Sequence, residues 1–371
     1  MAWYLVSILG LALLMVVHEA GHLAAARAFG MRVNTFSIGF GPTFFKIEPK
    51  DGFFWLTALR GRLRLRLRKH DPDKHGPTVY QVAMIPFLAY VQIAGMNPFE
   101  EHDPNDKGSY ANASLLGRIS TIFAGPLANY LFASVLFFFS FYYGGVLQAD
   151  GKSTEVNVMP DYPAAAAGIK DGDRIVQVDG TAVGQWDEMA KIISKHPDET
   201  ITVVLERAGQ RVSVTVQPKK QPDGRGIIGV ETVGHRVSVS LGEATKLAIT
   251  RPPRVVRDLV VGLAQLISGK VEAKLGGPVM IIREGAGAAK RGMADWLALL
   301  AIISAYLGAF NLVPFPALDG GRLIFLSYEL ATRRRRNARI EAHIHVVGLV
   351  MLIGLMLYVT IFNDFHLGGG K

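Results

Sequence analysis

Hydrophobic residues gather in four long runs along this 371-residue chain, each close to the roughly 20 residues that a membrane-spanning helix needs. The first run has no Lys or Arg before Arg27, and the second has no charged residue at all. A cleaved signal peptide is the alternative for the first run, but the positively charged leading region of such a peptide is missing. The pattern therefore predicts a polytopic α-helical membrane protein of about four transmembrane helices, over 2–29, 119–147, 296–313 and 346–362.

The stretch between the second and third runs, about 148–293, has a different pattern. Its segments 173–179, 200–206 and 211–216 alternate apolar and polar residues, which is typical of half-buried β-strands. Between them, 186–194 has helical spacing. We therefore expect an inserted α+β domain here rather than further spans.

One segment of this domain carries a more specific pattern. Residues 164–175 read AAAAGIKDGDRI and lead to Asp179-Gly180, so that Gly-Asp and Asp-Gly turns fall in register. Over about 152–235 the sequence resembles a PDZ domain, a fold that binds extended peptides or chain ends by strand addition. The resemblance implies a ligand loop at Gly168 and Ile169. A β-rich spacer without a ligand is the alternative.

Positive charge lies beside the apolar runs. The formal net charge is +9, and its densest clusters, 60–69 and 333–339, each follow an odd-numbered span. The positive-inside rule places both clusters in the cytoplasm, and hence the N-terminus and the PDZ-like domain outside it. Charge in this position favours contact with the lipid bilayer over nucleic-acid binding, and we expect no nucleic-acid partner.

Arginine and leucine alternate strictly over 62–68. This period of two predicts a strand with one basic face and one leucine face. We interpret it as part of an amphipathic hairpin that lies on anionic lipid headgroups.

The first apolar run contains a candidate metal site. The chain has no cysteine, which leaves His, Asp and Glu as ligands, and His18, Glu19 and His22 form an HExxH motif. On a helix, positions i and i+4 share a face, so both imidazoles can reach one metal ion while Glu19 stands to the side. Three ionisable groups at membrane depth are costly without a partner, which argues against ordinary core or surface histidines.

A catalytic zinc usually takes three protein ligands, so a third is needed. Asp319 is the best candidate, because it follows the third run in the segment 311–321, NLVPFPALDGG, where two prolines and two glycines must break the helix. An ordinary helix cap and turn is the alternative. His343 and His345 precede the fourth run, where a solvated helix end is the expected role for both.

These motifs together resemble the site-2 protease family of intramembrane zinc metalloproteases, in the bacterial branch with an extracytoplasmic PDZ domain. The resemblance rests on HExxH in the first span, on Asn-x-x-Pro-x-Pro-x-Leu-Asp-Gly-Gly at 311–321, and on AGPLAN at 124–129. It implies one Zn²⁺ per chain, bound by His18, His22 and Asp319, with Glu19 as the general base. His, His and Asp suit zinc, although they do not exclude another divalent ion.

The same resemblance implies a set of substrate-binding residues. The segment 89–93, AYVQI, resembles the membrane-re-entrant β element of the family, although relatives commonly carry Gly in place of Ala89. An exposed strand edge there can capture an unwound substrate segment. The residues expected to contact the substrate are Asn129, Asn311, Tyr90, Val91 and Pro314.

The predicted function is hydrolysis of peptide bonds within or near the transmembrane helix of a single-span protein, after a first extracytoplasmic cut. By resemblance the substrate is similar to an anti-sigma factor, with signal-peptide remnants as further substrates, and the PDZ-like domain binds a peptide or filters substrate ectodomains. The expected location is the bacterial inner membrane, with the active site toward the cytoplasm. The alternatives are a membrane-anchored quality-control metalloprotease with a cytoplasmic active site, and a non-enzymatic PDZ scaffold or transporter.

The predicted organisation runs through eight segments. They are span 1 with HExxH (1–29), a cytoplasmic-side loop with the hairpin and the re-entrant element (30–112), span 2 (113–147), the PDZ-like domain (148–240), an amphipathic connector (241–293), span 3 with the Leu-Asp-Gly motif (294–330), an Arg-rich loop (331–345), and span 4 with the tail (346–371).

Overall fold

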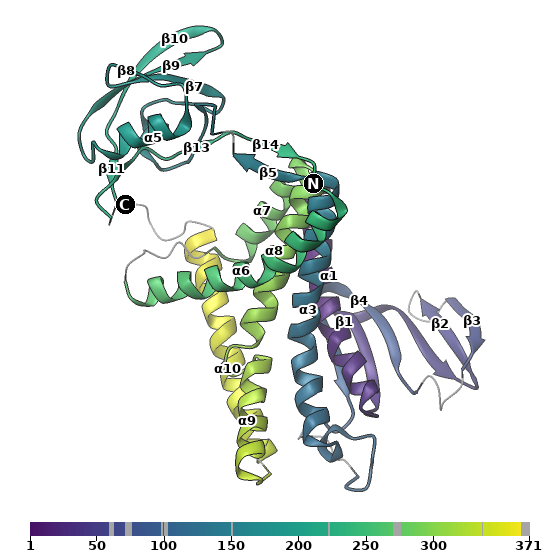
Figure 1. Ribbon diagram of the computed structural model, residues 1–371. Helices are drawn as coiled ribbons and strands as arrows, with labels where there is room; N and C mark the ends of the chain where they lie inside the picture. The colour runs from purple at the N-terminus through teal and green to yellow at the C-terminus, as the bar shows by residue number, and fades with distance from the viewer. Residues whose placement is uncertain are drawn as a thin grey trace. The chain divides into compact units, whose positions relative to one another are not determined.

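The computed structural model separates into two compact units, Met1–Gly144 with Ser240–Lys371 and Gly145–Val239, which are described separately (Figure 1). Arg60, Arg62 and Arg336 of the predicted basic clusters lie outside the described residues, as does the tail from 365. Only the backbone is described for 86–88 and 267. The described residues are 1–58, 63–70, 76–97, 99, 103–149, 151–221, 223–269, 276–335 and 337–364.

The first unit contains the predicted apolar helices. Within the described residues, four helices are long and apolar enough to cross a membrane, which confirms the four predicted runs. They are α1 (Ala2–Ala28), α3 (Leu115–Gly144), α8 (Met293–Asn311) and α10 (Ala338–Val359), the last extended by a π-helical turn, η3 (Thr360–Asp364).

Two helix ends differ from the prediction. Helix α3 ends at Gly144, because Gly145 has a φ of 69° and the chain continues as a strand. Helix α10 begins at Ala338 rather than near Val346, because the Asn337 side chain accepts hydrogen bonds from the backbone of the first helical turn. The predicted Arg-rich loop 331–345 is therefore too long, since its second half is helical.

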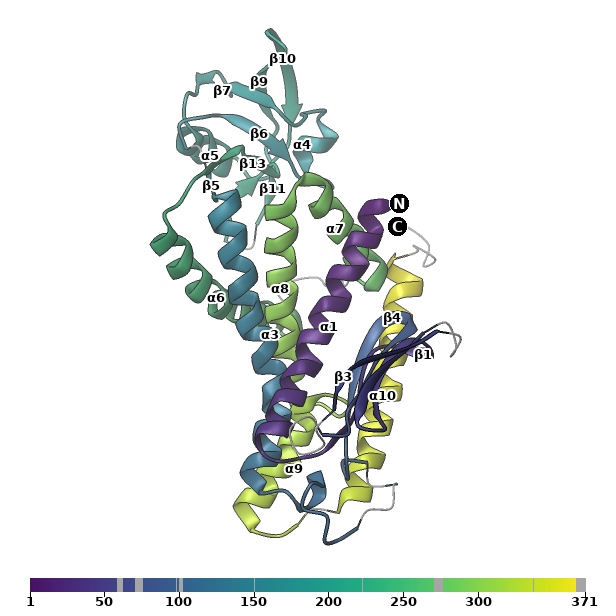
Figure 2. The same cartoon turned by 90° about the vertical axis from the view of Figure 1, so that its right-hand side faces the viewer.

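Helices α1, α3 and α8 run side by side (Figures 1 and 2), and small residues let their backbones approach. A Cβ added at Gly21 of α1 would overlap the carbonyl of Ala124 in α3. One added at Gly308 of α8 would stand 2.8 Å from the carbonyl oxygen of Pro126 in α3. This close packing brings the HExxH face of α1 directly against α3.

An antiparallel sheet of four strands lies along α1, in the order β3-β2-β1-β4 (Figure 1). The Arg-Leu alternation is confirmed as a strand, β3, whose Leu65 pairs with Leu56 of β2. Residues 80–82 of β4 pair with β1 on both sides, whereas residues 89–93 pair with it only at 33–38. Of the two strands that contact α1, β4 contacts it more extensively than β1 does. The strand bounds are β1 (Val33–Lys50), β2 (Phe53–Ala58), β3 (Leu63–Lys69) and β4 (Val79–Ile93).

Among the remaining helices of this unit, α9 is joined to α3 by a buried ion pair. The Arg118 guanidinium of α3 donates to both carboxylate oxygens of Glu329 in α9, at 2.6 and 3.0 Å, and both side chains are buried. A buried bidentate ion pair of this kind fixes the orientation of α9 against α3. The bounds are η2 (Tyr110–Asn112), α6 (Leu241–Ile267), α7 (Pro278–Arg291) and α9 (Asp319–Thr332).

The second unit is an α+β domain with a core of its own, built around Ile175, Val203 and Leu205. Its main sheet has the order β10-β9-β7-β6-β13, with β8 beside β7, and the three strands and the helix predicted from periodicity are confirmed as β7, β9, β10 and α5. The element bounds are β5 (Val146–Ala149), β6 (Glu155–Val158), α4 (Pro163–Ala166), β7 (Asp173–Val178), β8 (Thr181–Ala182), α5 (Trp186–Ser194), β9 (Ile201–Arg207), β10 (Gln210–Val216), β11 (Lys219–Lys220), β12 (Gly226–Ile227), β13 (Val230–Thr232) and β14 (Gly234–Val237).

Candidate metal centre

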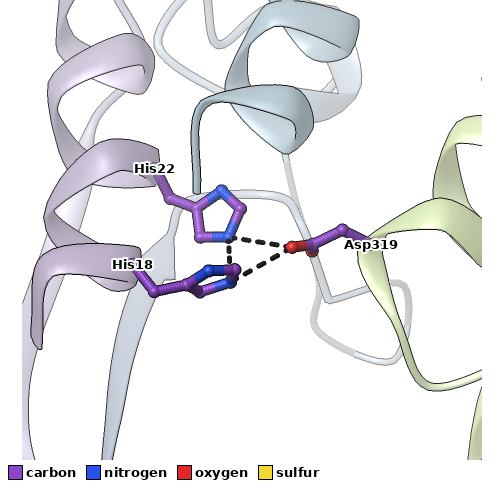
Figure 3. A group of neighbouring side chains, drawn as sticks. All are labelled: His18, His22 and Asp319. Carbon is purple, nitrogen blue, oxygen red and sulfur yellow. Dashed lines mark hydrogen bonds and ion pairs between the residues drawn. The ribbon is translucent and has the colours of Figure 1, made fainter. Parts of the chain in front are cut away.

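The two motif histidines project from one face of α1 and are buried, with 6% and 7% of their surface exposed. The Nε2 atoms of His18 and His22 lie 3.2 Å apart. Asp319, the first residue of α9, brings its Oδ2 atom to 3.1 Å from His18 Nε2 and 3.4 Å from His22 Nε2 (Figure 3). The structure therefore joins the three residues that the sequence predicted as ligands.

The geometry of this triangle suits a zinc ion. At ligand bonds of about 2.0–2.1 Å, the corners of a zinc tetrahedron lie about 3.3 Å from one another. Asp319 Oδ2 is buried without a hydrogen-bond partner in the described part of the chain, although it faces two imidazole nitrogens. A carboxylate oxygen and two imidazole nitrogens that converge on one point at these distances are the donor set that a zinc ion takes, so the residues fit the ion.

Hydrogen bonds on the far side of His22 set its tautomer. Its Nδ1 lies 2.7 Å from the carbonyl oxygen of Thr121 in α3, and a carbonyl can only accept. The proton is therefore on Nδ1, which leaves the Nε2 lone pair free for a metal.

Asn129 of α3 supports His18 in a similar way. Its side-chain amide lies 3.4 Å from His18 Nδ1, it is fully buried, and its Oδ1 has no hydrogen-bond partner among the described residues. Because amide oxygen and nitrogen are interchangeable by a flip, Oδ1 can accept from His18 Nδ1–H, which satisfies the oxygen and frees Nε2. The predicted contact of Asn129 with a substrate would require this side chain to turn away from His18.

Glu19 is held by the sheet. Its Oε2 accepts a hydrogen bond of 3.0 Å from the backbone N–H of Val91 in β4. The other carboxylate oxygen makes no hydrogen bond within the described residues, so it remains available for a proton. Strand β4 therefore orients the predicted general base beside the ligand triangle.

Gly125 of α3 lies against the His22 ring, and a Cβ added there would overlap the imidazole. We expect Gly125→Ala to displace His22 from the triangle and to weaken zinc binding by about 10–100-fold, the range typical of lost support for a ligand. Competition with a chelator of known affinity measures this. Gly262→Ala is the matched control, since Gly262 is also helical and has no neighbour within 4 Å of an added Cβ. Equal weakening in both variants would contradict the packing argument.

A hollow of about 450 Å³ is lined by neighbours of the candidate centre and not by His18, His22 or Asp319 themselves. Strand β4 forms one wall, and the turn before Asp319 forms another with α9 and α10. The predicted residues Tyr90 and Val91 line it, whereas Pro314 is exposed elsewhere and the Asn311 amide donates to Leu307 of its own helix at 3.0 Å. The lining residues are Tyr90, Val91, Gln92, Ile93, Met96, Asn97, Phe99, Ala317, Arg322, Ala342, His345, Val346 and Leu349.

The PDZ-like domain has a smaller hollow of about 250 Å³, between α5 and the segment 225–230. The predicted ligand residues Gly168 and Ile169 do not line it. Ile169 is 3% exposed and belongs to the domain core, and Gly168 forms a turn with a φ of 80°. The structure thus places these two residues away from the hollow.

His345 is a residue whose role the sequence interpretation missed. It was expected at a solvated helix end, but its side chain is 13% exposed and its Nδ1 accepts a 2.9 Å hydrogen bond from Ala317 N–H. The expectation was wrong because the segment around Ala317, 28 residues earlier in the chain, contacts this turn of α10 and covers the ring. Its neighbour His343 is exposed, as expected.

Comparisons with known proteins agree with this site. The model of Peptidase family M50 matches residues 6–61 and 68–355. RasP of Geobacillus kaustophilus, a zinc metalloprotease, is 30% identical over 95% of this chain and 94% of its own. Relatives from Nostoc sp. and Mesorhizobium japonicum, whose names also describe zinc metalloproteases, are 31% and 32% identical, over 96% and 95% of this chain and 94% and 96% of theirs.

A solved PDZ domain of an SdrC-like protein from Listeria monocytogenes matches 24% of this chain and 93% of its own length, at 22% identity and a TM-score of 0.20, a likeness too slight to support a conclusion. The family match is decisive by itself, because it covers almost the whole chain, including all three candidate ligands. The chain belongs to Peptidase family M50, the site-2 protease family, and is a zinc metalloprotease.

Proposed function

We propose that this protease cuts single-span membrane proteins within or near their transmembrane helix, after a first extracytoplasmic cut, as in regulated intramembrane proteolysis of an anti-sigma factor. One observation carries the proposal: His18 and His22 belong to a 27-residue helix that is apolar enough to cross a membrane, and α3 packs directly on the motif. A metal site among such apolar helices is not expected in a soluble metalloprotease, because burying ionisable groups there is costly.

The proposed location is the bacterial inner membrane, with the N-terminus and the PDZ-like domain outside the cytoplasm. Support comes from arginines of β3 and of the turn between α9 and α10, which would both face the cytoplasm in this orientation. The metal centre would then lie toward the cytoplasmic side.

Strand β4 is the proposed site of substrate capture. A transmembrane helix must unwind before a peptide bond can be cut, and each freed backbone group would cost several kcal/mol in hydrocarbon, roughly as estimated for unpaired amides. Because residues 90–93 of β4 line the 450 Å³ hollow and pair with β1 at 33–37 alone, an unwound segment can add to this part of β4 as a further strand. Asn311 and Pro314 are proposed to contact the substrate near the turn that leads to Asp319.

The residues of the centre divide the chemistry between them. When bound by His18, His22 and Asp319, zinc polarises a carbonyl and acidifies water. Glu19 takes a proton from the attacking water and passes it to the leaving amine. The Val91 N–H holds one carboxylate oxygen of Glu19, so that the other keeps a fixed direction during this transfer.

The PDZ-like domain is proposed to filter substrates by the size of their ectodomain, and its hollow beside α5 supports a second role in peptide binding. The domain can be removed cleanly, because Ala149 and Gly234 are paired residues of β5 and β14. Replacing 150–233 by a two-residue turn therefore leaves a short hairpin in its place.

A tagged single-span substrate tests both parts of the proposal. It is expressed with the protease in membranes, with either an intact or a trimmed outer domain, and the new terminus is mapped by mass spectrometry. The wild type is expected to cut the trimmed form alone, within the apolar segment, and the variant without the domain to cut both forms. A terminus outside the apolar segment would favour the quality-control alternative. Loss of all cleavage on deletion would mean that the domain recruits substrates.

A further inference from the structure

The turn between α8 and α9 has a backbone conformation that needs outside support. Ala317, two residues before Asp319, has a φ of 80°, in the left-handed region where a Cβ is unfavourable. A residue other than glycine keeps such a conformation only when its surroundings hold it there. The position of Asp319 therefore depends on what contacts this turn.

Helix α10 provides that contact. The Ala317 N–H donates to His345 Nδ1 at 2.9 Å. One turn further along α10, Gly348 lets the turn approach, since a Cβ there would overlap Pro316. A Cβ added at Gly321 would come to 3.2 Å from the His345 ring, so the start of α9 is packed against the same side chain.

The hydrogen bond also defines the state of the imidazole. Because Nδ1 accepts, the proton of the neutral ring is on Nε2, which lies 3.9 Å from Glu341 Oε1 one turn earlier on α10. His345 and Glu341 are both largely buried, with 13% and 8% of their side chains exposed. One ring nitrogen thus accepts from Ala317, and the other faces Glu341 at a distance too long for a hydrogen bond.

We propose that His345 is a positioning residue of the metal centre: its acceptor nitrogen holds the Ala317 turn so that Asp319 reaches both imidazoles. The inference rests on the assignment of Asp319 as a zinc ligand. It gives the fourth apolar helix a role in metal binding, although α10 contributes no ligand. Support of this kind commonly changes metal affinity by about 10–100-fold.

The test measures zinc affinity of the purified full chain by competition with a chelator, without any substrate. His345→Phe keeps a ring and removes the acceptor, and is expected to weaken zinc binding by about 10–100-fold. His345→Asn is expected to stay within about threefold of the wild type, because Asn Oδ1 replaces the Nδ1 acceptor. His343→Phe, on the exposed face of the same helix, is the control and is expected to change nothing.

A second variant separates positioning from general loss of folding. Glycine adopts a positive φ without cost, so Ala317→Gly added to His345→Phe is expected to recover part of the lost affinity. Wild-type affinity in His345→Phe, or equal weakening in His345→Asn, would overturn the proposal. Asp319→Ala is measured alongside: if it binds zinc like the wild type, the ligand assignment itself fails, and the inference fails with it.

Discussion

Glu19→Gln is expected to reduce peptide-bond cleavage by about 10²–10⁴-fold, the usual contribution of a general base, while zinc remains bound. The glutamine amide oxygen can still accept from Val91 N–H, so the side chain keeps its place on β4. It cannot take a proton from water, and the loss is therefore chemical rather than structural.

The measurement compares cleavage of the trimmed single-span substrate by the wild type and the variant at matched expression. Glu284→Gln, a change of an exposed acid on α7, is the control and is expected to cleave normally. Zinc content is determined on the same preparations. Equal cleavage by Glu19→Gln and the wild type would show that Glu19 is not the base.

Asp319→Ala is expected to weaken zinc binding by more than about 100-fold, since loss of supporting residues alone accounts for up to that factor. The variant leaves two imidazoles, whereas catalytic zinc sites usually have three protein ligands. Cleavage should fall together with the zinc content. In Glu19→Gln, by contrast, cleavage falls and zinc stays.

Zinc per chain, measured after dialysis against a weak chelator, checks this expectation. Asp258→Asn is the matched control, because Asp258 is an acid on α6 with 63% of its side chain exposed. Full zinc occupancy in Asp319→Ala would show that the third ligand lies elsewhere.

Short-range patterns were sufficient for many of the helices and strands and for two of the three candidate metal ligands. The four apolar helices follow from runs of hydrophobic residues, and β7, β9 and β10 follow from alternation, because each depends only on the face that a residue presents. For the same reason the spacing of His18 and His22 placed both imidazoles on one side of α1. The break after α8 was predictable from Pro314 and Pro316, whereas Gly320 and Gly321 lie in the first turn of α9 and do not break the helix.

Contacts between distant segments required the tertiary structure. The approach of Asp319 to α1 depends on the close packing of α3, and the support of His18 by Asn129 depends on the same helix interface. No local period carries that information. The family resemblance named Asn129 and Asn311 for the substrate, whereas the structure places one behind a ligand and the other on its own helix.

The sequence by itself determined many of the helices and strands and two candidate ligands on one helix face, because hydrophobic period and residue spacing are properties of a single segment. Only the tertiary structure decided the burial of His345 and its hydrogen bond to Ala317. In the sequence, a polar residue near a helix end has the same pattern whether water or another segment of the chain covers it in the folded protein. That difference is made by packing between segments, and it determines which side chains lie around the candidate metal centre.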